Sequence, residues 1–157
     1  MMRQKNPKLL KDIQEVGCLF LCLSKMSEDL YQYQYEPEQL NSVWEIAVKK
    51  SYIVNRETKS PDGVLKLLKQ IANVSSDKNI IQIGQTLNGV TQYWGWVQDK
   101  HKKNIQTMAM EKIGGSIGTH FVLVKSLDDP VIIYDSWNLA RIGERSNAQR
   151  FIYYAVI

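Results

Sequence analysis

The stretch "THFVLVKSLDDPVIIYDSW", residues 119–137, has the composition of two β-strands joined by a tight turn. Each half is rich in β-branched and aromatic residues, and Ser, Asp and Pro separate the halves. Side chains alternate between the two faces of a strand, so we expect His120 to share a face with Val122, and Asp135 with Ile133. A two- or four-residue turn places His120 directly opposite Asp135, within hydrogen-bonding reach, whereas a three-residue turn breaks this register.

The rest of the chain divides into a helical part and a strand-rich part. Before Asn79 the hydrophobic residues have helical spacing, and after it short strand-like segments follow one another, namely residues 79–84, 91–98, 104–111, 119–126, 131–136 and 150–157. This order predicts an α+β fold in which N-terminal helices pack on a C-terminal antiparallel sheet. At 157 residues the chain is expected to form one domain, with a helical half at about 1–78 and a sheet half at about 79–157.

Helix signals mark the helical half. A first helix over residues 7–29 is expected to break at Gly17, because glycine destabilises a helix interior. A second begins with Pro37 in its first turn, and a third begins after Ser60 as N-cap, with Pro61 at its first position. The predicted core residues are Leu19, Phe20, Cys22, Leu23 and Met26 of the first helix, and Leu40, Val43, Trp44, Ala47 and Val48 of the second.

The stretch "DIQEVGCLFLCLSKM", residues 12–26, places Cys18 where an apolar helix begins. Cys18 is either a small core residue or a nucleophile. Cysteine attacks as a thiolate, and a helix N-terminus and a nearby imidazolium both stabilise that form. His120 and Asp135 would supply the imidazole and the carboxylate that orients it. Cys22, inside the helix, is expected to be inert core filling.

Two residues near Cys18 suit the same chemistry. A tetrahedral intermediate needs hydrogen-bond donors, and the backbone N–H of Cys18 and the side-chain amide of Gln14 are candidates. Gly17 would let a substrate approach the backbone closely. A lone His–Asp pair on a sheet is often structural, so it is the combination with Cys18 that predicts catalysis.

The ordered set of these residues resembles a known superfamily. A glutamine, a Gly-Cys pair opening an apolar helix, a strand "HFVLV" and a carboxylate on the next strand resemble the papain-like cysteine peptidases. The likeness is greatest to their compact bacterial members, the bacteriocin-leader-peptidase-like proteins, and covers about residues 10–26 and 118–138. The whole chain is also similar to a poorly characterised family of spirochaete and prophage-associated proteins.

The resemblance implies a papain-like fold and a peptidase or amidase without a cofactor, with peptidoglycan peptides as one substrate class. It implies Cys18 as nucleophile, His120 as general base, Asp135 as its orienting partner and Gln14 as oxyanion donor. Two positions depart from the family pattern. Gln14 lies closer to Cys18 than is usual, and Leu19 stands where many relatives have a small residue.

Further residues are candidates for substrate binding. Trp137 follows Asp135 by two residues and is expected on the same face, beside the site. Gly118 ends a glycine-rich loop just before His120. This loop would turn tightly beside the site or gate it. Trp94 and Trp96 are either cleft-lining or core aromatics.

Other functions find less support in the sequence. The formal net charge is only +4, and the basic cluster "KHKK" is expected to be a solvated loop, although Lys100, Lys102 and Lys103 would serve a nucleic-acid-binding alternative. The cysteines and histidines lack zinc-site spacing, so no metal is expected. No signal peptide or membrane span is apparent, which favours a cytoplasmic protein or one released without a leader. The main rival to a peptidase is a catalytically inactive papain-like domain that binds a peptide or protein partner.

Overall fold

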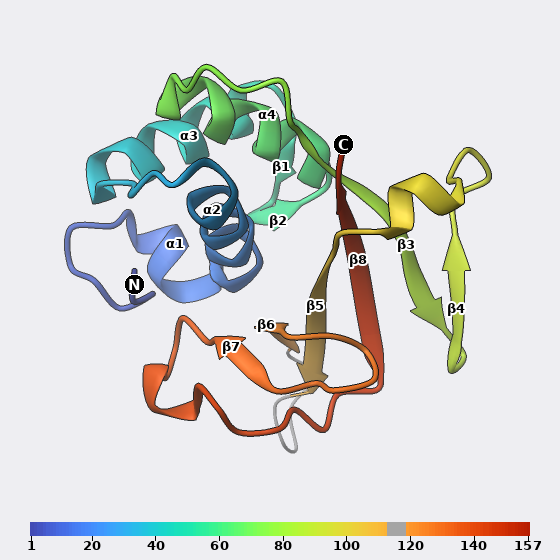
Figure 1. Cartoon of the computed structure of the whole chain (residues 1–157). Helices are drawn as coiled ribbons and strands as arrows, with labels where there is room; N and C mark the ends of the chain where they lie inside the picture. Colours follow the sequence, from blue (N-terminus) through green and yellow to red (C-terminus); the bar gives the residue numbers. More distant parts are fainter. Residues whose placement is uncertain (113–118) are drawn as a thin grey trace.

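The helices of this computed structural model, which describes residues 1–112 and 119–157, gather on one side of the molecule (Figure 1). The central helix α2 packs on α4 and on strand β6, and α3 packs on α4. A short hairpin lies between α3 and α4 in the chain. The elements of this half are α1 (Lys11–Val16), α2 (Cys18–Tyr31), α3 (Pro37–Lys49), β1 (Ile53–Val54), β2 (Glu57–Thr58) and α4 (Pro61–Ala72).

The described residues of the C-terminal half form a six-stranded sheet with the order β4-β3-β8-β5-β6-β7. Its neighbouring strands pair antiparallel. In Figure 1 the β3–β4 hairpin extends away from the helices. The predicted α+β fold, with helices first and an antiparallel sheet second, is therefore confirmed. The elements are β3 (Ile80–Leu87), β4 (Val90–Tyr93), η1 (Asp99–Lys102), β5 (Ile105–Lys112), β6 (Thr119–Val124), β7 (Ile132–Tyr134), η2 (Leu139–Arg141) and β8 (Arg150–Val156).

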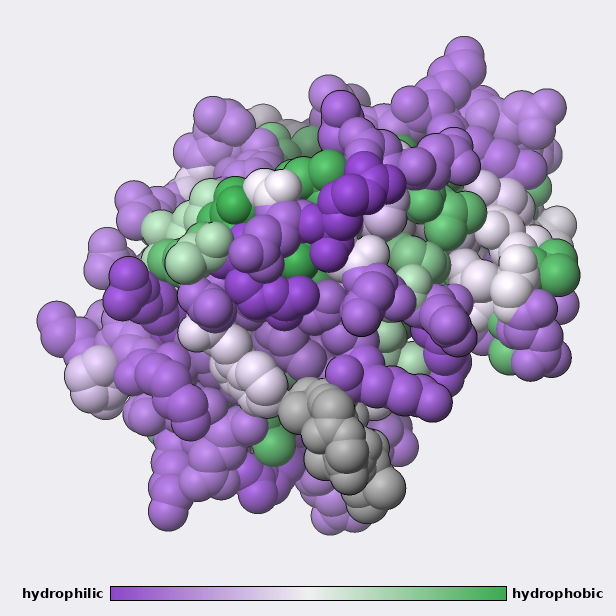
Figure 2. All heavy atoms as spheres, turned by 90° about the horizontal axis from the view of Figure 1, so that it is seen from below, coloured by the Kyte–Doolittle hydropathy of each residue, from purple (hydrophilic) through white to green (hydrophobic). Residues whose placement is uncertain are grey.

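Two hydrophobic clusters lie on either side of the central strands, as the alternation of side chains along a strand requires. Met108 and Leu123 belong to the large cluster shared with the helices, whereas their neighbours Ala109 and Val122 belong to a smaller cluster. Figure 2 shows the molecule from below, with hydrophobic residues on this face in separate groups among hydrophilic ones. In the described part of the chain, no helix is both long and apolar enough to cross a bilayer.

The helix starts follow the predicted signals. Pro37 and Pro61 begin α3 and α4, and Ser60 caps α4 by accepting a hydrogen bond from the N–H of Gly63 at 3.2 Å. One predicted core residue is wrong: Val48 is 48% exposed. Val48 lies in the last turn of α3 and lines a shallow surface hollow beside Leu10, instead of facing α4.

Gly17 breaks the first helix, as predicted, because α1 and α2 meet there in close contact. A Cβ atom added to Gly17 would lie 2.5 Å from the carbonyl oxygen of Ile13 and 2.9 Å from its Cα. We expect Gly17→Ala to lower the free energy of unfolding by about 1–3 kcal/mol, the usual cost of overpacking. Urea denaturation measures this change. The matched control is Gly95→Ala, because a Cβ at Gly95 meets no atom within 4 Å; equal stability of both variants would contradict the prediction.

The hairpin of β6 and β7 differs from the predicted register. Leu123 pairs with Tyr134 and Val124 with Ile132, so Ile133 is an extra residue that forms a β-bulge. The strand then ends at Tyr134, and Asp135 lies beyond it. Asp135 is therefore not opposite His120 in the ladder, and it does not share a face with Ile133, which is 38% exposed while Asp135 is 1% exposed.

Candidate active site

Cys18 is the first residue of α2 and is 6% exposed. Its N-cap is Gly17, which has no side chain, so no side chain caps the first turn. The first N–H groups of a helix lack partners within it and favour negative charge nearby. Cys22 differs, because it is fully buried and its Sγ donates to the carbonyl oxygen of Phe121 at 3.4 Å. Burial, with the nearby Cys18 and Asp135 charges, raises the pKa of the Cys22 thiol well above its ordinary value.

His120 lies on β6 with its ring enclosed on several sides. Its Nε2 lies 2.7 Å from Oδ1 of Asp135, although the two residues are not ladder partners. The indole of Trp137 stacks on the imidazole, with ring centroids 4.2 Å apart and an angle of 11° between the planes. His120 is only 3% exposed. The ring is therefore fixed by a carboxylate at one nitrogen and by an aromatic face.

The Asp135 carboxylate is bound at both oxygens. Oδ1, besides facing His120, accepts the backbone N–H groups of Trp137 at 2.9 Å and Asn138 at 3.3 Å, and Oδ2 accepts Nη1 of Arg141 at 2.9 Å. Burial alone would raise the pKa of Asp135, but the bond to His120 and the other donors outweigh it and hold the pKa below its ordinary value. Asp135 is therefore an ionised carboxylate aimed at the imidazole.

The Cys18 thiol interacts with the His120 imidazole, whose Nε2 faces Asp135. Burial disfavours the charged ring, but the bond to Asp135 and the interaction with Cys18 outweigh it and raise the pKa of His120 to about 9. The second nitrogen, Nδ1, is buried and has no hydrogen bond of standard geometry to the described residues. Catalytic hydrogen bonds are often long before substrate binds. We infer that Nδ1 faces the Cys18 thiol.

An open cleft of about 620 Å³ leads to Cys18. One wall is the tip of the β1–β2 hairpin, where Asn55 and Arg56 have positive φ angles. Arg56 forms ion pairs with Asp12 and Glu15 of α1 and so links the hairpin to the helix that precedes Cys18. The lining residues are Glu15, Val16, Cys18, Leu19, Asn55, Arg56, Glu57, Thr58, Met110, Thr119, Phe121 and Trp137.

Comparison with known proteins adds a family to this geometry. The model of the family DUF261, whose description is protein of unknown function, matches residues 1–151. The chain belongs to DUF261. No curated protein and no solved structure matches this DUF261 chain.

The DUF261 fold brings several of the predicted site residues together. Cys18, His120, Asp135 and Trp137 lie in one place, from α2, β6 and the segment after β7. Gly118 and the rest of the predicted gating loop lie outside the described residues. Trp94 and Trp96 are not among the described residues that line the cleft, and they are 37% and 45% exposed.

Gln14 and Gly17 have clear structural roles near the site. Nε2 of Gln14 donates to the carbonyl oxygen of Leu9 at 2.8 Å, and Gln14 is not among the described residues that line the cleft. Its role as oxyanion donor stays a prediction. Gly17 adjoins Cys18, and the close approach of Ile13 explains the need for glycine there without a substrate.

Sequence reasoning missed a second layer of residues around the site. Arg141 bonds to Asp135 and also, through both of its terminal nitrogens, to Glu111. Gln4 is fully buried. Its backbone N–H donates to the carbonyl oxygen of Ser136, and its side-chain Oε1 accepts a hydrogen bond from the Ser136 hydroxyl, both at 2.9 Å. Of these residues, Glu111 could have been noticed in the sequence. It is a charged residue at a position of the strand 105–112 where the alternation expects a buried side chain.

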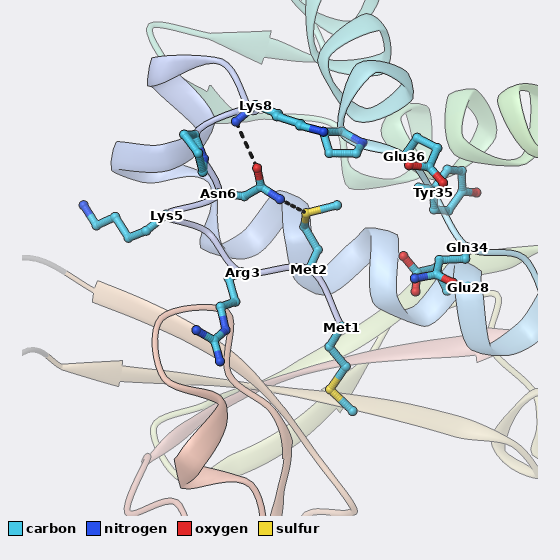
Figure 3. A pocket seen from close by; sticks show the side chains of 12 residues that line it. Met1, Met2, Arg3, Lys5, Asn6, Lys8, Glu28, Gln34, Tyr35 and Glu36 are labelled. Atoms are coloured by element: carbon cyan, nitrogen blue, oxygen red, sulfur yellow. Dashed lines mark hydrogen bonds between the residues drawn. The ribbon is translucent and has the colours of Figure 1, made fainter.

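A larger hollow, of about 740 Å³, lies elsewhere in this DUF261 chain (Figure 3). The N-terminal segment and the loop between α2 and α3 form it, and it is lined by basic Arg3, Lys5 and Lys8 and by acidic Glu28 and Glu36. Figure 3 shows Asn6 bridging to the backbone N–H of Lys8 and to the sulfur of Met2. Its lining holds no cysteine or histidine, so the smaller cleft at Cys18 is the better candidate site. Among the described residues, no group of three or more His, Cys, Asp or Glu is placed to hold a metal ion.

Proposed function

We propose that this protein is a thiol hydrolase of papain-like architecture that cleaves a peptide or amide bond through Cys18, His120 and Asp135. The observation that supports it best is the position of His120, between a thiol at a helix N-terminus and an ionised carboxylate. A nucleophile, a base within reach of it and a third group that orients the base are the components of covalent acyl transfer.

The mechanism follows from the charges. With a pKa of about 9, His120 is an imidazolium at neutral pH and stabilises the Cys18 thiolate beside it. The Cys18 sulfur attacks the substrate carbonyl, and the first N–H groups of α2 stabilise the oxyanion, with Gln14 as a second candidate donor. His120 gives its proton to the leaving amine, which leaves an acyl-thioester. A water molecule then gives a proton to His120 and hydrolyses the thioester.

The cleft indicates what kind of substrate fits. Apolar groups of Val16, Leu19 and Phe121 form part of its lining, beside the indole of Trp137. Apolar side chains beside polar and charged ones suit a peptide with at least one apolar side chain. Peptidoglycan peptides are a substrate class that the family resemblance alone suggests. Both cysteines are free thiols, which suits a reducing compartment such as the cytoplasm.

Alkylation by iodoacetamide tests the proposal without a substrate. We expect Cys18 to be labelled rapidly below about pH 7, at a rate about tenfold or more above that of an ordinary thiol, because its thiolate is stabilised by His120. His120→Gln keeps the volume and removes the cation, so rapid labelling should be lost. The rate of Cys18 labelling in wild type and in His120→Gln is measured by mass spectrometry of peptides from protein labelled at a series of pH values between about 5 and 9.

Cys22 is the internal control of this experiment. It lies in the same helix, is fully buried and has a raised thiol pKa, so it should be labelled slowly in both proteins. Labelling of Cys18 at the rate of an ordinary thiol, or equally in wild type and His120→Gln, would contradict the proposed function.

The alternative is a catalytically inactive domain that binds a peptide or protein partner in the same cleft. The small exposed fractions of Cys18 and His120, 6% and 3%, favour it, because a reactive pair needs access to substrate. Slow labelling of Cys18 in a protein that still binds peptides would support this alternative.

A further inference from the structure

A network of buried polar groups continues from Asp135 away from the cleft. Nη1 of Arg141 donates to Oδ2 of Asp135 at 2.9 Å and to Oε1 of Glu111 at 2.9 Å, and its Nη2 donates to Oε2 of Glu111 at 2.9 Å. The Ser146 hydroxyl also donates to Oε2 of Glu111, at 2.8 Å. Glu111 is 6% exposed and Asp135 is 1% exposed, so solvent screens these two carboxylates little, whereas the Arg141 side chain is 30% exposed.

Glu111 also lies beside His120 directly. The two residues are facing partners in the antiparallel pair of β5 and β6, so their Cβ atoms are neighbours on one face of the sheet. Burial disfavours the charge of Glu111, but the bonds from Arg141 and Ser146 and the charge of His120 outweigh it and lower its pKa. The two residues therefore stabilise one another as a carboxylate and an imidazolium.

Counted with Cys18 as a neutral thiol, the charges of this network balance when His120 is protonated, and the Cys18 thiolate of the proposed mechanism adds one further negative charge. The charged and titratable groups that face the His120 ring are Asp135, Glu111 and the Cys18 thiol, with Arg141 acting through Asp135. Asp135 and Glu111 are buried and negative and the partly exposed Arg141 is positive, so without the proton of His120 this group has one excess negative charge. Buried charges that lack a partner are costly, which favours the imidazolium.

We propose that Arg141 and Glu111 are a positioning pair for the hydrolase: Arg141 holds the outer oxygen of Asp135, and Glu111 holds Arg141 and keeps His120 in its imidazolium form. The inference rests on the proposed function, because neither residue lines the cleft. Neither touches the reacting atoms. They act through Asp135 and His120, and so the protonation of His120 is the property that reports their role.

Proton NMR of the imidazole Cε1–H groups measures this property. The chain has only two histidines, His101 and His120, and His101→Gln assigns their resonances. In Glu111→Gln the amide oxygen still accepts a hydrogen bond, but the negative charge is gone. We expect the pKa of His120 to fall by about one unit or more, because a neighbouring opposite charge typically shifts a pKa by about that amount.

Glu144→Gln is the matched control. Glu144 approaches the same arginine, with Nε of Arg141 3.8 Å from its Oε2, but its side chain is 66% exposed. Solvent should screen its charge, and the His120 titration should stay as in wild type. An unchanged His120 pKa in a folded Glu111→Gln variant overturns the positioning role.

Two further outcomes separate this inference from the proposed function. Rapid alkylation of Cys18 in wild type with no effect of Glu111→Gln overturns the positioning pair alone. Slow alkylation in wild type overturns the proposed function, and with it the reaction that the pair would serve. If Glu111→Gln does not fold, Arg141→Lys decides instead. It keeps the charge but not the forked hydrogen bonds, so Cys18 alkylation should slow about fivefold or more, and an unchanged rate overturns the role.

Discussion

Cys18→Ser is expected to reduce the hydrolysis of peptide amides by about 10³-fold or more, because a serine hydroxyl is not ionised beside an imidazolium as a thiol is. The substitution removes no buried volume of consequence and leaves the bonds between His120 and Asp135 in place. Loss of activity would therefore report the loss of the nucleophile. A library of fluorogenic peptide aminomethylcoumarins, screened with wild type and variant at equal concentration, provides the measurement.

Cys22→Ser is the control for this loss. It makes the same chemical change four residues later in the same helix, and its hydroxyl still has the carbonyl oxygen of Phe121 as acceptor. Activity near that of wild type is expected. Hydrolysis that survives in Cys18→Ser, or that is lost equally in both variants, would rule out Cys18 as the nucleophile.

Asp135→Asn is expected to lower hydrolysis by about 10²- to 10⁴-fold, because the imidazole loses the carboxylate that orients and charges it. The amide cannot replace both oxygens. If the oxygen of the introduced side-chain amide faced Nε2 of His120, its NH₂ group would face the N–H donors of Arg141, which bind Oδ2 of Asp135 in wild type. Rates measured with the same library, and the titration of His120, report the two effects separately.

The same variant tests the dependence of stability on pH. The pKa of His120 is raised to about 9, so its contribution to stability is full below the ordinary imidazole pKa of about 6.5 and is lost as the pH rises through 9. The pKa of Asp135 is lowered, so its contribution is present above its ordinary value of about 4 and is lost as the pH falls. Wild type should be most stable between these ordinary values.

Urea denaturation at a series of pH values checks this prediction. We expect the free energy of unfolding of wild type to fall on the order of 1–3 kcal/mol between about pH 6.5 and pH 9, and to fall much less in Asp135→Asn. Asp128→Asn is the matched control, because Asp128 is an exposed aspartate in the turn of the same hairpin. Equal slopes in wild type and Asp135→Asn would refute the coupling of these two residues.

The α+β architecture could be predicted because it depends on local patterns. Cys18, His120 and Asp135 were predicted as site residues from their order in the chain, and their catalytic role stays a prediction. Helical spacing prevails before Asn79 and strand spacing after it, apart from the short β1–β2 hairpin. Cys18 begins α2, His120 lies near the start of β6, and Asp135 follows β7. The pairing of His120 with Asp135 was predicted through a ladder register that is wrong. The bulge at Ile133 and the bend after Tyr134 bring the carboxylate to the imidazole by a different path.

The supporting residues were beyond prediction for a physical reason. The sequence around Arg141 and Arg56 does not distinguish them from ordinary surface arginines. Only the folded chain places Arg141 against Asp135 and Arg56 against α1. Pairing of distant charges depends on packing in three dimensions, and no local period reveals it. Glu111 alone had a local signal, as a charge on the buried face of a strand.

The contacts of Gln4 with Ser136 have a consequence for how the site forms during folding. Together with the bond from the Tyr134 hydroxyl to the carbonyl oxygen of Met2, at 2.6 Å, they join segments that are 132 residues apart. Contacts between such distant segments have a large loop-closure entropy, so we expect them to form late in folding. A chain emerging from the ribosome can form its helices, with Cys18 in place, well before His120 and Asp135 are synthesised. We therefore expect the thiol to meet His120 and Asp135 only when the sheet half packs on the helices.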